Sequence, residues 1–146
     1  MRVSARDIRA YDRTIIEQFR GEGEMQDGFD REQLILLTTT GARSGQAHTT
    51  PLVFYPDGDR LLVVAAAAGA PRNPAWYVNL LADDTVTVES AEGTYAARAH
   101  PLEGAEYDKV WSSLKEGRLF LAEYEAAAHR RLPVVALVRV MPGAGG

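Results

Sequence analysis

The sequence predicts a single α+β domain over residues 1–146, built around about six mainly antiparallel strands with flanking helices. Short apolar runs of strand length are separated by turn residues typical of hairpins, and amphipathic helical patterns stand at the start, middle and end of the chain. Strands and helices do not alternate regularly, which argues against a doubly wound nucleotide-binding fold. Closure of such a sheet into a barrel would remove its open edges.

The first element is an amphipathic helix, predicted over residues 5–20. Four apolar side chains recur there at helical spacing and glycines follow, namely Ile8, Tyr11, Ile15, Phe19, Gly21 and Gly23. Residues 22–31 are expected to form a loop. The apolar side of this helix can cover the sheet, mediate a dimer or touch a membrane surface, and its pattern allows all three.

Three apolar runs rich in strand formers come next, at residues 34–38, 49–55 and 61–66. Residues 56–59 contain Asp and Gly and predict a hairpin turn between the second and third runs.

The second half of the chain predicts a helix, a hairpin, two further helices and a last strand. Asn73 is the expected N-cap of the first helix, with Pro74 at its first position and Leu81 near its end. The remaining predicted elements are a hairpin of strands 85–89 and 94–100, helices 103–114 and 119–129, a strand at 134–140 and a disordered tail at 142–146.

Composition excludes several functional classes. The 16 Lys and Arg residues against 20 Asp and Glu leave a net charge of −4, which argues against nucleic-acid binding because that requires a concentrated basic face. The chain has no Cys, which excludes thiolate metal sites and thiol nucleophiles and is consistent with a cytoplasmic location. No apolar run reaches the length of a transmembrane helix, and no secretory signal is visible.

No catalytic motif of a hydrolase or metalloenzyme is present. The histidines His48, His100 and His129 are far apart and lack metal-ligand spacing, so no metal site is predicted. Ser44 lies in neither a nucleophile elbow nor a phosphate-binding loop, since no Lys follows Gly45.

Two segments are candidates for binding chemistry. Residues 38–51 combine glycines, hydroxyls and Arg43, a pattern that suits an anion such as phosphate or carboxylate, but a plain polar hairpin loop has the same composition. In the predicted middle helix, Trp76 and Asn79 offer an aromatic wall and an amide, although Trp76 also suits the core. Tyr107 and Tyr124 are candidates for exposed helix positions or for half-buried packing.

Taken together, residues 36–45, 49–53, 69–80 and 132–135 resemble the deazaflavin-dependent nitroreductase family in order and spacing. The resemblance runs from about residue 15 to residue 138. It implies a split β-barrel of the flavin-reductase and pyridoxamine-phosphate-oxidase type. It also implies binding of a deazaflavin coenzyme, F-420, typical of actinobacteria.

The resemblance carries family roles over to named positions. The positions that match the family's binding site for the phosphate and acidic tail of the coenzyme are Arg43, Ser44, Gly45 and His48. Those that flank the deazaflavin ring are Thr50, Pro51, Leu52, Ala65, Ala66 and Ala67. Those on the helix that closes the other side are Ala75, Trp76 and Asn79. Tyr124 matches a tyrosine that lines the substrate pocket.

The resemblance implies an oxidoreductase that passes a hydride from the coenzyme to an electron-poor small molecule such as a nitroaromatic, a quinone or an enone. The chain departs from the family pattern in having His48, Ala67 and Leu121 where many relatives have a basic residue, a lysine and a tyrosine. These departures motivate an alternative, a non-catalytic barrel that binds a lipid-like or other apolar ligand. Flavin mononucleotide is a further, less favoured coenzyme. Both a monomer and a homodimer are compatible with the sequence.

Overall fold

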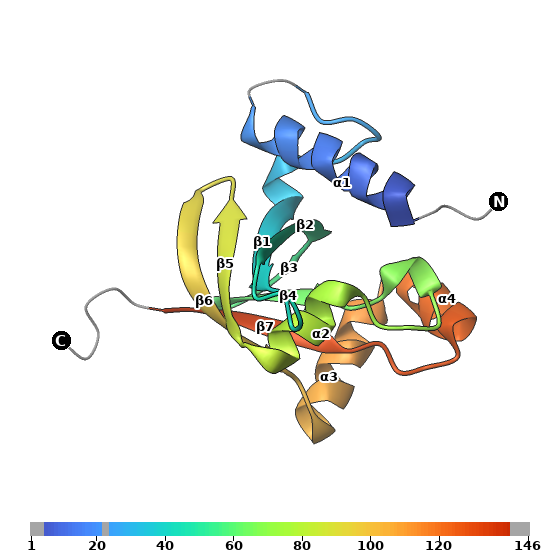
Figure 1. Cartoon of the computed structure of the whole chain (residues 1–146). Coiled ribbons are helices and arrows are strands. Elements are labelled where there is room, and N and C mark those ends of the chain that lie inside the picture. Colours follow the sequence, from blue (N-terminus) through green and yellow to red (C-terminus); the bar gives the residue numbers. More distant parts are fainter. Residues whose placement is uncertain (1–4, 22–23, 141–146) are drawn as a thin grey trace.

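The computed structural model describes residues 5–21 and 24–140, with side chains from residue 10 onward (Figure 1). Its helices are α1 (Ala5–Arg20), α2 (Ala75–Ala82), α3 (Gly104–Lys115) and α4 (Leu119–Ala128), with short 3-10 helices η1 (Arg31–Gln33) and η2 (Ala67–Gly69). Its strands are β1 (Leu34–Thr40), β2 (Ala47–Val53), β3 (Tyr55–Asp57), β4 (Arg60–Val64), β5 (Thr85–Ser90), β6 (Gly93–Pro101) and β7 (Val134–Arg139).

The strands form one sheet in the order β2-β1-β5-β6-β7-β4-β3, with every neighbouring pair antiparallel. The described part of the chain has seven strands where about six were predicted. β2 and β3 lie at opposite edges of the sheet, yet Phe54 alone separates them in sequence. The sheet must therefore curl until its two edges meet, and Figure 1 shows this curled half-barrel.

The predicted strand over residues 49–55 is wrong in one respect, because it is two strands. Its first part pairs with β1, and its last residue, Tyr55, pairs with Leu62 of β4. The change of partner occurs at Phe54, whose N–H donates to the carbonyl of Gln33 at 3.1 Å. The hairpin of β3 and β4 is confirmed with a tighter turn than predicted, since Asp57 already pairs with Arg60.

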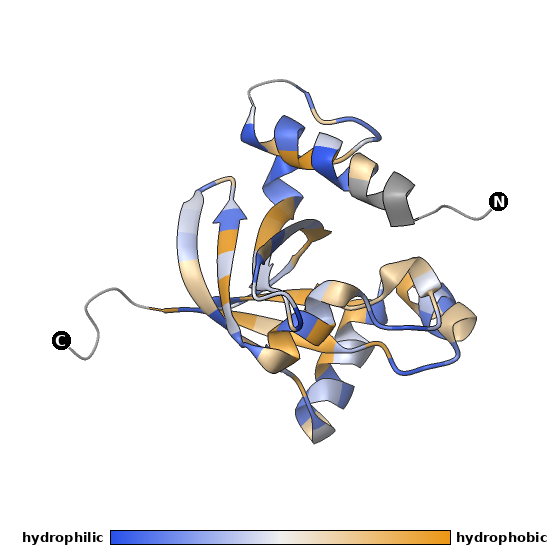
Figure 2. Ribbon diagram, viewed as in Figure 1, coloured by the Kyte–Doolittle hydropathy of each residue, from blue (hydrophilic) through white to orange (hydrophobic). Residues whose placement is uncertain are grey.

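The second predicted hairpin is confirmed as β5 and β6, with Ser90 opposite Gly93 at the turn. Side chains along β5 alternate between exposed and buried over its first four residues. Figure 2 shows the matching alternation of hydrophilic and hydrophobic residues as bands of colour. The predicted last strand is β7. The predicted disordered tail at 142–146 lies outside the described residues.

Helix α1 covers the outer face of β1. Ile15 and Phe19 are buried against Leu34 and Leu36, which point to that face because side chains alternate along the strand. Tyr11 is more exposed, and its hydroxyl donates to Asp27 at 2.7 Å. Of the three roles that the helical pattern allows, the structure therefore shows the covering of the sheet.

Two larger apolar clusters fill the rest of the molecule. One lies between the concave face of the sheet and α2, and its buried members include Ile35, Val63, Val88 and Leu80. The other joins α3 and α4 to β4 and β7, with Trp111 and Leu132 among its buried members. Burial of apolar surface on both sides of the sheet holds the helices in place.

The predicted N-cap of α2 is wrong. The helix begins at Ala75 after Pro74, and Asn73 caps nothing. The Asn73 side-chain oxygen accepts a hydrogen bond from Arg130 Nη1 at 2.6 Å instead. A charge-assisted bond to a guanidinium is stronger than an ordinary cap bond, which accounts for the difference.

The expectation that Tyr107 occupies an exposed helix position is also wrong. Tyr107 on α3 is 5% exposed, and its hydroxyl donates to the carbonyl of Leu132 at 2.7 Å. The ring packs parallel to Trp111 with the centroids 6.3 Å apart. This buried contact fixes α3 to the segment that enters β7.

We expect the substitution Tyr107→Phe to lower the free energy of unfolding by about 1–2 kcal/mol, because it leaves the buried Leu132 carbonyl without a donor. Urea unfolding measures this effect. Tyr95→Phe is the matched control, since the Tyr95 hydroxyl has no hydrogen-bond partner among the described residues. Equal stability of the two variants would contradict the prediction.

Candidate functional site

The topology brings the two predicted coenzyme-binding loops to one end of the sheet. Four antiparallel steps separate β1 from β4 in the sheet, so these two strands run in the same direction. The 41–46 loop follows the carboxyl end of β1, and the 65–73 segment follows the carboxyl end of β4. Helix α2 comes directly after the 65–73 segment and packs against the concave face of the sheet.

The 41–46 loop is a tight connection that requires glycine. Gly41 N–H donates to Gln46, and Gly45 N–H donates back to the Gly41 carbonyl at 3.0 Å. Gly45 has a positive φ of 69°, which side chains disfavour. A Cβ added at Gly41 would collide with Ser44 Oγ and come within 2.9 Å of His48 Nε2. The structure thus brings the predicted Ser44, Gly45 and His48 together.

Asn79 ties this loop to α2. Its side-chain oxygen accepts the N–H of Ala42 at 3.0 Å, and its side-chain nitrogen donates to Thr39 Oγ1 at 3.2 Å. Asn79 is only 9% exposed, so an unpaired amide there would be costly. Asn79 therefore holds the 41–46 loop in place from the side of α2.

The predicted residues of β2 divide between two faces. His48, Thr50 and Leu52 pair with β1 residues that point toward α2, whereas Pro51 pairs with Leu36 on the face that α1 covers. The side chains of Thr50 and Leu52 thus lie on the same face of the sheet as Asn79, which bonds the 41–46 loop, whereas the side chain of Pro51 lies on the opposite face.

The 65–73 segment leaves β4 in an unusual backbone conformation. Ala67, Ala68 and Gly69 have φ values of 46°, 52° and 85°, and alanine disfavours this left-handed region. Gly69 packs on α4, where an added Cβ would lie 3.2 Å from Ala127 and 3.5 Å from Tyr124 Cα. The segment and Tyr124 are therefore neighbours.

Tyr124 also contacts Phe120, a residue that lines a hollow. Its half-buried ring meets Phe120 edge to face with the centroids 5.9 Å apart. Phe120, Val53 and Phe54 line a hollow of about 360 Å³ between β2 and the start of α4. The Tyr124 hydroxyl has no hydrogen-bond partner among the described residues, so it is available to a ligand.

The donors at this end of the molecule suit an anionic coenzyme. The N–H groups of Ala66, Ala67 and Ala68 have no acceptor in the described part of the chain. The exposed guanidinium groups of Arg43 and Arg72 form no ion pair or hydrogen bond with any described residue. Backbone donors and free cations are the groups that bind phosphate and carboxylate oxygens.

Other predicted residues have structural roles. Trp76 is 6% exposed and packs in the same buried cluster as Ala65, so the indole is a core side chain, whereas Ala75 beside it is exposed. Ala66 lies in the cluster beneath α4. Leu121, where the family resemblance leads us to expect a change in the pocket, is 2% exposed in that same cluster.

Sequence reasoning missed Arg130. Its five N–H groups make six hydrogen-bond contacts, five with backbone carbonyls and one with Asn73, because the two N–H groups of Nη2 are shared among three carbonyls. The adjacent Arg131 instead lies over the Tyr107 ring, 3.6 Å from its centroid. No local pattern distinguishes the two arginines in the sequence.

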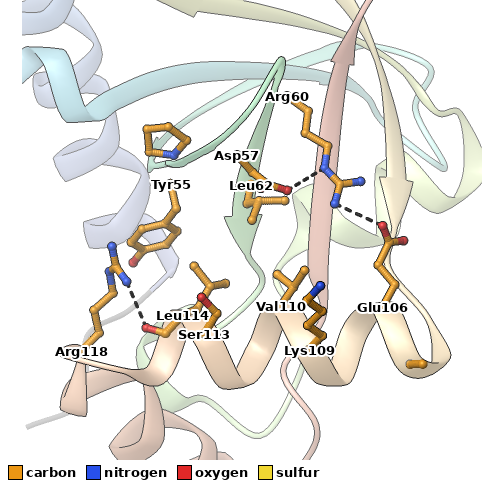
Figure 3. A pocket seen from close by; sticks show the side chains of 12 residues that line it. Tyr55, Asp57, Arg60, Leu62, Glu106, Lys109, Val110, Ser113, Leu114 and Arg118 are labelled. Carbon is orange, nitrogen blue, oxygen red and sulfur yellow. Dashed lines mark hydrogen bonds and ion pairs between the residues drawn. The ribbon is translucent and has the colours of Figure 1, made fainter.

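A second hollow, with a volume of about 590 Å³, lies elsewhere, between the β3–β4 hairpin and α3 (Figure 3). No predicted site residue lines it. Arg60 bonds Asp57 and Glu106 across it, and Arg118 lies over the Tyr55 ring and donates to the Leu114 carbonyl. Burial raises the pKa of Tyr55, and Arg118 opposes the rise. Arg60, Asp57 and Glu106 thus pair within the protein, whereas Lys109 and Arg118, which also line the hollow, form no ion pair with a described residue.

The described residues show neither a metal-binding cluster nor a membrane-spanning helix. No group of three or more His, Cys, Asp or Glu side chains gathers among them in a way that could hold a metal ion. None of the described helices is long and apolar enough to span a bilayer.

The chain is similar to a family of known proteins. The family model for F-420H(2)-dependent quinone reductase matches residues 10–139. An F-420H(2)-dependent quinone reductase of Mycobacterium tuberculosis is 35% identical over 108 residues, which are 72% of each chain.

Two solved structures are similar at comparable identity. An F-420-H2 dependent reductase, FDR-A, has a TM-score of 0.64 and 33% identity, over 72% of this chain and 93% of that one. A domain-swapped dimer has a TM-score of 0.66 and 32% identity, over 92% of this chain and 99% of that one. The predicted split-barrel fold is confirmed. The chain belongs to the F-420H(2)-dependent quinone reductase family and is a reductase that uses coenzyme F-420.

Proposed function

We propose that the protein transfers a hydride from reduced coenzyme F-420 to a quinone, which takes up a proton and becomes a hydroquinone. The observation that carries the proposal is the convergence of the 41–46 loop, the 65–73 segment and α2 at one end of the sheet. The names of the relatives support a quinone over the nitroaromatic and enone substrates that the resemblance also allows. The bound coenzyme supplies the hydride chemistry.

The residues of the 41–46 loop would hold the acidic tail of the coenzyme. Arg43 offers a free guanidinium that can bind a phosphate with two parallel bonds. Asn79 restrains the loop through the Ala42 N–H, so fewer backbone conformations are lost on binding. Ser44, Gly45 and His48 complete this part of the proposed site.

The ring of the coenzyme would lie beside the 65–73 segment, between the backbone of Ala65, Ala66 and Ala67 and the face of β2 that carries Thr50 and Leu52. The free N–H groups there are donors for polar atoms of the ring. Pro51, Ala75 and Trp76 remain predictions for the same site. Through its core packing, Trp76 would hold α2 rather than stack on the ring.

Tyr124 is the proposed catalytic residue. Its backbone neighbours Gly69 of the 65–73 segment, and its ring contacts Phe120, which lines the hollow. The proposal therefore places the quinone within reach of the Tyr124 hydroxyl. A phenol in hydrogen-bond reach of the quinone oxygen orients the substrate and delivers a proton to the developing anion. Val53, Phe54 and Phe120 in the lining of the hollow suit a quinone ring and its substituents, and the hollow is also lined by the polar side chains of Glu32, Gln33 and Arg118.

Location and assembly complete the proposal. The absence of Cys supports a cytoplasmic location. The domain-swapped dimer of a similar protein supports a homodimer over a monomer, and light scattering on the purified protein distinguishes the two.

The direct test is oxidation of the reduced coenzyme by a water-soluble quinone, followed by the recovery of coenzyme absorbance. We expect turnover with the quinone and none when reduced flavin mononucleotide replaces the coenzyme. A nitroaromatic and an enone serve as competing acceptors. Absence of quinone turnover with coenzyme bound would contradict the proposal, whether or not the nitroaromatic or the enone is reduced.

Replacement of Arg43 by Ala should weaken coenzyme binding by about tenfold at low salt, equivalent to ~1.4 kcal/mol. The loss should shrink at high salt, because exposed charges are screened. Fluorescence titration of the coenzyme measures both values. Arg13→Ala is the control, since Arg13 is an exposed cation on α1, outside the proposed site. An unchanged dissociation constant would remove Arg43 from the site.

Replacement of Tyr124 by Phe should lower kcat with the quinone by about a hundredfold, because the proton donor is lost, and leave the coenzyme dissociation constant unchanged. Steady-state kinetics and the same titration separate the two quantities. Tyr95→Phe on β6 is the control for loss of a tyrosine hydroxyl. Full turnover in Tyr124→Phe would exclude the proposed role.

A further inference from the structure

Arg130 stands at the junction between α4 and the segment that enters β7. Its side chain reaches across to the 65–73 segment, where Nε donates to the Ala70 carbonyl at 3.1 Å and Nη2 donates to the Arg72 carbonyl at 3.1 Å. Nη1 donates to Asn73 Oδ1 at 2.6 Å. One guanidinium thus bonds this segment at several points along its length.

Two more bonds reach the start of the segment. Nη2 lies 3.2 Å from the Ala65 carbonyl and 3.3 Å from the Ala66 carbonyl. A trans peptide is planar, with its C=O and N–H on opposite sides, and the described chain contains no cis peptide. The N–H groups that share these two peptides belong to Ala66 and Ala67, and they point away from Arg130.

These are the same N–H groups that have no acceptor in the described part of the protein. A positive charge bonded to the carbonyl side of a peptide polarises it, which makes its N–H a stronger donor. The bonds also hold the segment against the cost of left-handed φ values at Ala67 and Ala68. Arg130 thereby fixes both the direction and the strength of these donors.

We propose that Arg130 is a positioning residue, which acts through the 65–73 segment to aim its backbone N–H groups at the coenzyme. This inference rests on the proposed function. It assigns the role through the peptides of Ala65 and Ala66 and requires no contact between Arg130 and the coenzyme.

The test compares Arg130→Met and Arg130→Lys with the neighbouring control Arg131→Met. The control removes the same charge but breaks bonds to Leu102 and the Tyr107 ring instead. In coenzyme-free protein we expect amide exchange of Gly69 and Ala70, which bond within the segment, to accelerate in Arg130→Met and to stay unchanged in Arg131→Met.

With coenzyme, Arg130→Met should raise the dissociation constant by about tenfold or more, and by the same factor at low and high salt. The KM for the coenzyme should rise while the KM for the quinone is unchanged. Arg130→Lys should recover little, because an ammonium lacks the planar fork that reaches several carbonyls.

Three outcomes would overturn the inference. They are unchanged exchange and affinity in Arg130→Met, full recovery by Arg130→Lys, and a loss of affinity that disappears at high salt, which would indicate direct charge pairing. A wild-type chain that binds no coenzyme would contradict the proposed function instead. The exchange rates of Gly69 and Ala70 would then still decide whether Arg130 holds the segment.

Discussion

The single-residue link at Phe54 is the constraint on which the rest of the structure depends. It joins two strands that lie at opposite edges of a seven-stranded order, so the sheet has to curl. The curl creates a concave face for α2 and leaves an outer face for α1. The 41–46 loop and the 65–73 segment follow β1 and β4, and both adjoin α2, since Asn79 of α2 bonds Ala42 and the 65–73 segment leads into α2.

In this part of the molecule, two side chains hold the backbone of the proposed binding segments in place. Asn79 restrains the 41–46 loop and Arg130 restrains the 65–73 segment, and both side chains use their hydrogen-bonding capacity on the protein itself. The groups left free are backbone N–H donors and the exposed cations Arg43 and Arg72. A site of this kind binds an anion with a pre-formed set of donors, so little ordering remains to be done on binding.

Local sequence patterns predict most of the elements, because hairpin turns and alternating burial leave clear signals, as in β5 and β6. The division of residues 49–55 into two strands has no such signal, since Phe54 suits either strand and the change of partner depends on Gln33 far back in the chain. Likewise, Asn73 followed by Pro74 has the pattern of a cap, and only the approach of Arg130 gives Asn73 another partner.

The sequence predicts the segments of the candidate site, but it does not predict the distant side chains that hold these segments in place. Glycines, hydroxyls and Arg43 mark the 41–46 loop in the sequence. Arg130 and the buried hydroxyl of Tyr107 act through contacts with residues distant in sequence, and such contacts leave no periodicity or spacing to read. The coenzyme itself followed from the family resemblance, because no single segment specifies a deazaflavin.

The central claim is that coenzyme F-420 binds at the end of the sheet where β1 and β4 finish. Titration of the coenzyme into isotopically labelled protein, followed by NMR spectra of the backbone amides, tests this location most directly. We expect the largest chemical-shift changes of backbone amides at residues 41–46 and 65–70, with smaller ones at Asn79. Shifts confined to the hollow between β3, β4 and α3 would contradict it.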